Sequence, residues 1–257
     1  MPHGVTWFNF IFENFLVWRD RLQELIGTTY WKHSNISLQY VTGFLFIGVL
    51  LFFLVAIARR KINAERGLIP DNRLNWRTFF EMMIEGALNT MESIMDRKAA
   101  RFFLPLITAC MFIIFFSNFF GLIPGFEPPT GNLNTTLALA LIIFFTTHIY
   151  GVKVHGFGKY FGHWMGPIRK WYALPLMVFL FLIELVSHFA RPMSLSIRLM
   201  GNMFADHLVV ASFTLLVPLI VPVPMLLLGV LVCIVQTAVF CILSSVYIGI
   251  AVAHEEH

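Results

Sequence analysis

The sequence predicts an all-α membrane protein with about five membrane helices, together with amphipathic helices that lie at the membrane surface. Hydrophobic residues make up 58% of the chain and charged residues only 12%, whereas roughly a quarter of the residues in soluble domains are charged. The mean hydropathy is +0.77. The net charge of +4 comes from the loops, so it indicates membrane topology and not nucleic-acid binding.

The loops between the apolar runs predict the orientation. Residues 37–58 can supply a first span, and the loop that follows, ARRKINAERGLIPDNRLNWR, is rich in Lys and Arg. Basic loops stay in the cytoplasm, so residues 1–32 are expected to form an outer N-terminal segment. Residues 102–123 and 133–152 form the next two spans, with an acidic turn between them and a basic loop after them. The same alternation predicts a cytoplasmic C-terminus.

Residues 76–100 have a different pattern, because polar residues recur there every three or four positions and so share one face of a helix. Apolar residues occupy the opposite face. This pattern predicts a helix that lies in the membrane interface, and a helix packed on a soluble partner is the alternative. The polar positions are Glu81, Glu85, Asn89, Glu92 and Asp96.

The chain then runs from Trp171 to about Leu216 without a polar loop. A helix of that extent is about 69 Å long, whereas one upright crossing needs only about 30 Å. The segment is therefore either two spans or one steeply tilted helix bent at Pro192, and we favour the tilted helix. With the last apolar helix, 225–252, it would form a charge-bearing hairpin over residues 171–253. No internal repeat is visible, so we expect a single polytopic domain.

A narrow polar seam follows this long segment. Only Arg191 and Arg198, of all the Lys and Arg residues, lie inside an apolar run. A cation at membrane depth costs roughly 2.5 to 3.5 kcal/mol, and a guanidinium cannot escape by deprotonating. Such a residue must face protein or water, although ion pairs made only for packing are an alternative. The seam residues fall within about 80° of one another around the helix; they are Glu184, His188, Arg191, Leu195, Arg198, Asn202 and Asp206.

Other polar residues also lie in apolar runs. Gln236 in the last helix must find a hydrogen-bond partner, and the seam around Arg198 and Asn202 is the expected place. For His148, a packing role is favoured over a proton relay. The spacing of His188 and His207 is a poor match for haem ligation. Cys110, Cys233 and Cys241 have no metal-binding or disulfide spacing, so we expect neither a metal nor a cofactor.

The string SLSIRLMGNMFADHLV closely resembles the arginine-bearing helix of subunit a of the F-type ATP synthase, bacterial type. SNFFGLIPG, NTTLALAL, ELVSHFARPMSLSIRL and QTAVFCILSSVYIGIAVAHEEH support the resemblance, which covers residues 33–257. It implies the proton-channel stator of a bacterial inner membrane, not catalytic by itself. Its implied partners are a ring of small hairpin subunits, each with a buried carboxylate, and the peripheral-stalk subunit of the same complex.

The resemblance also implies roles for individual residues: an essential arginine, two channel-lining groups, two polar neighbours of the arginine and one outer-channel residue. Three positions depart from the pattern of some members, since His207 replaces an acid, Gly229 a histidine and Gly121 an acid. Among the residues implied in proton translocation, Arg198 is the essential arginine, and Glu184 and His207 are the channel-lining groups. Asn202 and Gln236 are the polar neighbours of the arginine, and Asn118 is the outer-channel residue.

Two other classes compete with this interpretation. A secondary transporter that binds an anion at the intramembrane arginine should show inverted repeats or paired broken helices, and the sequence shows neither. An intramembrane hydrolase would need a nucleophile beside a base, and no such motif is present. The sequence leaves open whether H⁺ or Na⁺ is the coupling ion, because the selecting carboxylate would belong to the ring.

Overall fold

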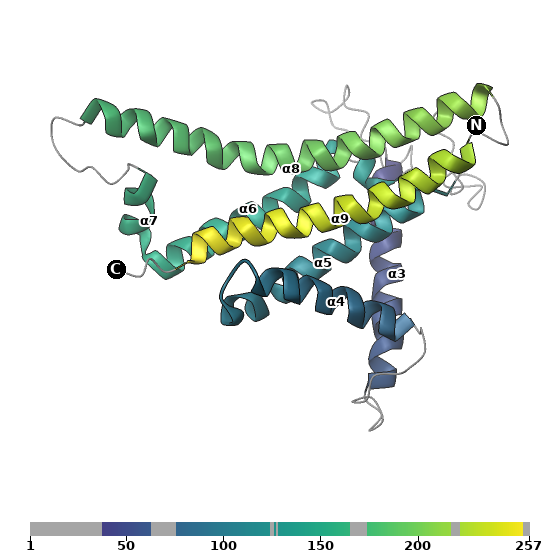
Figure 1. Ribbon diagram of the computed structural model, residues 1–257, viewed down its shortest axis with the longest axis horizontal. Helices are drawn as coiled ribbons and strands as arrows, with labels where there is room; N and C mark the ends of the chain where they lie inside the picture. Colours follow the sequence, from purple (N-terminus) through teal and green to yellow (C-terminus); the bar gives the residue numbers. More distant parts are fainter. Residues whose placement is uncertain are drawn as a thin grey trace, which may run out of the picture.

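A computed structural model describes residues 38–62, 76–123, 126, 128–164, 174–216 and 222–253, and in these ranges the regular structure is helical (Figure 1). The all-α class predicted from the sequence is confirmed. The α-helices are α3 (Leu38–Ile62), α4 (Trp76–Glu92), α5 (Arg97–Gly121), α6 (Leu133–His155), α7 (Phe157–Trp164), α8 (Leu174–Leu216) and α9 (Pro222–Val252), and the 3₁₀ helix η2 (Pro129–Gly131) lies between α5 and α6.

Among the described residues, α5, α6, α8 and α9 are long and apolar enough to cross a membrane. The shorter apolar stretch Gly43–Ile57 in α3 coincides with the predicted first span. Large apolar side chains such as Phe52 and Phe179 are exposed on α3 and α8, as expected for surfaces that meet lipid or another membrane subunit. The chain is therefore a multi-pass membrane protein.

The open question about residues 171–216 is answered by α8, which is one continuous helix of 43 residues. Its length is about 65 Å, roughly twice the hydrocarbon thickness. Pro192 lies inside the helix, and α8 is bent near its middle (Figure 1). The antiparallel helix α9 lies beside it, and both run across α3 at a large angle (Figure 1). The predicted hairpin of two long helices is therefore observed, and its tilt in the membrane stays a prediction.

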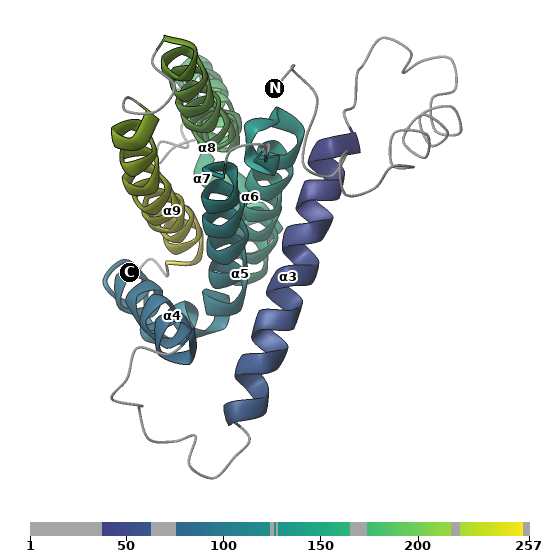
Figure 2. The same ribbon diagram turned by 90° about the vertical axis from the view of Figure 1, so that its right-hand side faces the viewer.

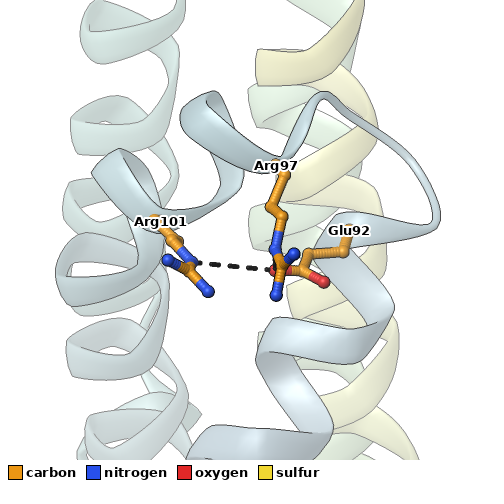
Figure 3. Close-up of polar contacts among 3 residues, drawn as sticks. All are labelled: Glu92, Arg97 and Arg101. Carbon is orange, nitrogen blue, oxygen red and sulfur yellow. Dashed lines mark hydrogen bonds and ion pairs between the residues drawn. The ribbon is translucent and has the colours of Figure 1, made fainter.

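The predicted single helix over residues 76–100 is wrong in its extent, because α4 ends at Glu92 and α5 begins at Arg97. The Ser93 hydroxyl donates to the Thr90 carbonyl at 2.7 Å, and Asp96 has extended backbone, which interrupts the helix. At this corner the Glu92 carboxylate accepts a hydrogen bond from Arg97 Nε at 3.2 Å and lies 3.9 Å from Arg101 Nε (Figure 3).

The amphipathic pattern of α4 nevertheless corresponds to its packing. Phe80, Ala87 and Met91 are buried, while Glu85 and Asn89 are exposed on the other side. The buried face packs on α5 and α9 (Figure 2). Placement of α4 in the membrane interface stays a prediction.

Helices α5 and α6 form the centre of the molecule. α5 packs against α3, α4 and α9, and α6 packs against α8 and α9 (Figure 2). One core cluster joins α4 to α5 through Phe80 and Phe112, whose rings lie 5.0 Å apart. A second cluster joins α5, α6, α8 and α9 and includes Ile143, Leu199 and Phe240. α8 is thus fixed on one side and exposed on the other.

A corner between α6 and α7 was not predicted from the sequence, which reads as a basic loop there. Gly156 has a φ of 80° between the two helices, a left-handed conformation that favours glycine. The ring of Tyr160 on α7 packs against Gly151 on α6, where a Cβ atom would lie 2.5 Å from Cε2 of Tyr160. Burial raises the pKa of the Tyr160 hydroxyl, so this group stays neutral at physiological pH. The missing side chain of Gly151 therefore makes the docking of α7 possible.

We expect Gly151→Ala to displace Tyr160 and to lower the free energy of unfolding by about 1–3 kcal/mol, the usual effect of overpacking. Gly158→Ala is the matched control, because a Cβ atom there would meet no atom within 4 Å. Thermal unfolding of the purified chain in detergent, followed by circular dichroism, compares the two variants. Equal midpoints for both would contradict the packing role of Gly151.

Candidate functional site

The structure divides the polar seam of α8 into a buried part and an exposed part. His188 and Leu195 are buried, Leu195 with only 2% of its surface accessible. Arg198 and Asn202 are exposed, at the edge of the surface that α8 presents away from α6. The seam is therefore not one continuous surface, as its angular pattern alone suggested. Neighbouring helices bury His188 and Leu195, and Arg198 itself stays exposed.

Arg198 makes no hydrogen bond or ion pair with any described residue. Of the two acids in the seam, Glu184 has its carboxylate 3.4 Å from Nε2 of His188. Asp206 makes no ion pair with Arg198. Arg191 lies 5.4 Å above the ring of Tyr247 on α9. Within the described part of the chain, the alternative that Arg198 is an ion pair made for packing is therefore not supported. Its charge is available to a group outside this chain.

The expected partner of Gln236 is confirmed. The amide nitrogen of Asn202 donates to Oε1 of Gln236 at 2.7 Å, and Gln236 is only 3% exposed. Asn202 lies 11 residues after Arg191 on α8, and Gln236 lies 11 residues before Tyr247 on α9. The two contacts therefore fit one antiparallel register of the two helices. Phe240, almost fully buried, lies opposite Arg198 in that register. α9 thus fixes the amide beside Arg198 while leaving the guanidinium exposed.

A second polar cluster lies where α5 ends. Asn118 and Thr130 are fully buried, and the Thr130 hydroxyl donates to Oδ1 of Asn118 at 2.6 Å. Nδ2 of Asn118 has no hydrogen-bond partner among the described residues. His207 comes close to the same helix end, since a Cβ atom on Gly121 would lie 3.3 Å from Nε2 of His207. Two predicted site residues, Asn118 and His207, are thus brought to one end of the bundle.

The two glycines that depart from the resemblance have a common physical explanation. Gly121 borders His207, and a side chain there would also collide with the ring of Pro128. A Cβ atom on Gly229 would lie 3.4 Å from Oδ2 of Asp206 and 2.5 Å from Leu122. Both glycines therefore leave room for the polar side chains of α8.

Glu184 lies at the other end of the seam, about 21 Å along α8 from Arg198. Sequence reasoning missed its surroundings, because His148 was considered alone. The rings of His148 and His188 lie 5.0 Å apart at 81°, across the contact between α6 and α8. A signal was present, since the predicted span 133–152 carries His148 and the long apolar run after it carries His188. The predicted site residues therefore form three groups along α8: Glu184 at one end, Arg198 with Asn202 and Gln236 in the middle, and His207 with Asn118 at the other end.

Among the described residues, no group of three or more His, Cys, Asp or Glu side chains could hold a metal ion. The three cysteines are buried free thiols in the apolar helices. What the geometry does define is a multi-pass membrane protein with an uncompensated arginine between two separated polar clusters, a class suited to ion transport.

Comparison with known proteins identifies the particular family. The sequence profile of the family described as ATP synthase A chain matches residues 41–249. The chain is 46% identical to ATP synthase subunit a of Geobacter sulfurreducens over 200 residues, which is 78% of this chain and 81% of that protein. It is 39% identical to the Sorangium cellulosum subunit a over 90% of both chains. It is 40% identical to the Campylobacter curvus subunit a over 88% of this chain and 95% of that protein.

The chain therefore belongs to the ATP synthase subunit a family, as the sequence resemblance implied. Membership places it in a membrane complex with other subunits, in ATP synthesis coupled to ion transport.

The bond between Asn202 and Gln236 yields a quantitative prediction. Asn202→Ala and Gln236→Ala should interact in a double-mutant cycle by about 0.6 kcal/mol, and at most about 1.7, the range of such bonds between membrane helices. Thr237→Ala is the control, because the Thr237 hydroxyl bonds only the Cys233 carbonyl of its own helix. Thermal unfolding of the four chains in detergent measures the coupling. Additive effects of Asn202→Ala with Gln236→Ala would contradict the bond.

Proposed function

We propose that this chain is the proton-translocating stator subunit of an F-type ATP synthase, with two aqueous half-channels and Arg198 facing the rotor ring. The observation that carries the proposal is the exposed charge of Arg198, which has no ion pair among the described residues and lies between the Glu184 and His207 groups of α8. The predicted roles of Asn202, Gln236 and Asn118 belong to the same proposal.

Arg198 acts on the buried carboxylate of each ring subunit. A protonated carboxyl group is neutral and can face lipid, whereas an ionised carboxylate cannot. The fixed guanidinium stabilises the ionised form as it passes and so promotes loss of its proton. The same charge repels a cation that would cross directly between the half-channels. Neighbouring Asn202, held by Gln236, supplies polar surface beside the guanidinium without neutralising it.

The two half-channels are assigned to the two polar ends of α8. His207 and Asn118 would line the outer one, and Glu184 the cytoplasmic one. Because α8 is tilted, these ends are displaced sideways as well as in depth, so protons enter and leave at different ring positions. Each charge crossing a potential of 100 mV releases about 2.3 kcal/mol, which this displacement converts into directed rotation.

The orientation and the partners follow from charge and exposure. Arg97 and Lys98 at the start of α5, and Lys153 near the end of α6, are basic residues at helix ends of the same side, which we assign to the cytoplasm. The C-terminus would then be cytoplasmic and the segment 1–32 outside, in a bacterial inner membrane. The exposed apolar surface of α8 around Arg198 would meet the ring, and other membrane surfaces the peripheral-stalk subunit. The chain itself would catalyse no chemical reaction.

The transporter alternative needs broken helices whose ends point at a substrate. α8 and α9 are instead continuous across their apolar lengths. The exposure of Arg198 also favours a protein partner over an enclosed small anion.

Arg198→Ala should abolish coupling while the complex still assembles, because the side chain is exposed and makes no hydrogen bond or ion pair with the described residues. Arg198→Lys should not restore full function, since an ammonium is compact and more strongly hydrated than a guanidinium. ATP synthesis and ATP-driven proton pumping in membrane vesicles measure both effects. Arg101→Ala, which removes an exposed cation 3.9 Å from Glu92, is the control and should stay coupled. Normal coupling in vesicles carrying Arg198→Ala would refute the proposal.

His207→Ala should slow proton flux, most visibly where imidazole titrates, roughly pH 5 to 8. Glu184→Gln should slow it as well, and the double variant should be no slower than the slower single if both lie on one path. Pumping rates in vesicles, normalised to assembled complex, provide the comparison. A His207→Gln variant that pumps at the normal rate across pH 6 to 9 would leave His207 a packing residue.

A further inference from the structure

A histidine pair lies in the contact between α6 and α8, on the buried part of the polar seam. The rings of His148 on α6 and His188 on α8 are 5.0 Å apart and nearly perpendicular. Phe144 lies against His148 with its ring centre 4.1 Å away, so one face of the pair is apolar. On the other side, Nε2 of His188 is 3.4 Å from Oε1 of Glu184. The partly exposed Glu184 carboxylate is thus next to His188, and His188 is next to His148.

A cavity continues from this pair along α8 toward the level of Arg198. It lies between α6, α8 and α9, and its lining includes His148, His188, Arg191, Leu195 and Tyr247. Leu195 is one helical turn before Arg198. On α8 the cavity extends from His188 to Leu195, and so lies within the interval between Glu184 and Arg198 across which a proton would have to move on the cytoplasmic side.

We propose that His148 and His188 are proton-relay residues of the cytoplasmic half-channel, which pass protons between the cavity below Arg198 and Glu184. This inference rests on the proposed function and adds two residues to it. An imidazole accepts a proton at one ring nitrogen and releases one from the other, so it returns to its neutral form after each transfer. Glu184 receives the proton as a carboxyl group and releases it to the cytoplasm. No electron transfer and no further reactant is needed.

The charged groups around the histidine pair favour passing a proton on over retaining it. On α8, the Glu184 carboxylate can compensate a proton on His188, while the nearby Arg191 guanidinium opposes a lasting positive charge. Tyr160 on α7 has its ring centre 6.0 Å from that of His148, and Tyr247 on α9 lies under Arg191. The carboxylate and the guanidinium therefore act in opposite directions on a proton held by the pair.

The test uses the intact complex in inverted vesicles, whose cytoplasmic face is exposed to the buffer. His148→Gln and His188→Gln should each slow ATP-driven pumping about tenfold. This is less than the roughly hundredfold effect at the lower end for a positioned proton-transfer group, because water can replace part of a relay. The double variant should be no slower than the slower single variant. The dependence of the wild-type rate on buffer pH should also flatten in each variant. His155→Gln, at the end of α6, is the matched control and should behave as wild type.

His148→Phe separates relay from packing, because a phenyl ring preserves the aromatic contacts with Phe144 and His188 but carries no proton. A slow His148→Phe variant supports the relay, and a normal rate overturns it. Where a Gln variant fails to assemble, the Phe variant decides by the same criterion. A wild-type rate that does not respond to buffer pH between 5 and 8 also overturns the relay. If Arg198→Ala loses coupling and the histidine variants pump at the normal rate, only the relay is refuted. If Arg198→Ala retains coupling, the proposed function itself is refuted.

Discussion

The structure depends on one electrostatic constraint, which is that the Arg198 guanidinium stays charged at membrane depth without a counter-ion among the described residues. Such a group is stable only if the surrounding protein leaves it access to water or to a partner's charge. Neighbouring helices bury His188 and Leu195 but not Arg198. α9 holds Asn202 through Gln236. The packing of α6 and α9 on α8 therefore determines which part of α8 is available to the rest of the complex.

Much of the fold could be predicted from the sequence, because membrane helices obey strong local rules. A run of apolar residues long enough to cross a bilayer must be helical, so the described spans begin and end within a few residues of their predicted limits. Local rules did not predict where α4 stops. The polar period continues through Asp96, but the turn after Glu92 depends on backbone geometry and on contacts with Arg97 and Arg101. The corner at Gly156 was missed for the same reason.

The candidate site was only partly predictable, since periodicity gives an angle around one helix and not the neighbour that covers it. Leu195 and Arg198 share a seam by angle, yet one is buried and the other is exposed. The partnership of Asn202 and Gln236 could be expected, because an amide buried in an apolar helix needs a partner. The meeting of His148 with His188 could not, because it depends on the relative depth and rotation of two helices, which no single-helix pattern contains.

The length of α8 has a further consequence, which concerns the lipid. A helix of about 65 Å fits a hydrocarbon layer of about 30 Å only at a slant, and a thinner layer requires a flatter hairpin. Flattening moves the two polar ends of α8 farther apart in the membrane plane and brings them closer in depth. Bilayer thickness therefore affects how proton passage is coupled to rotation. In membranes with shorter or longer acyl chains, the same polypeptide would offer proton entry and proton exit at a different distance from each other along the ring.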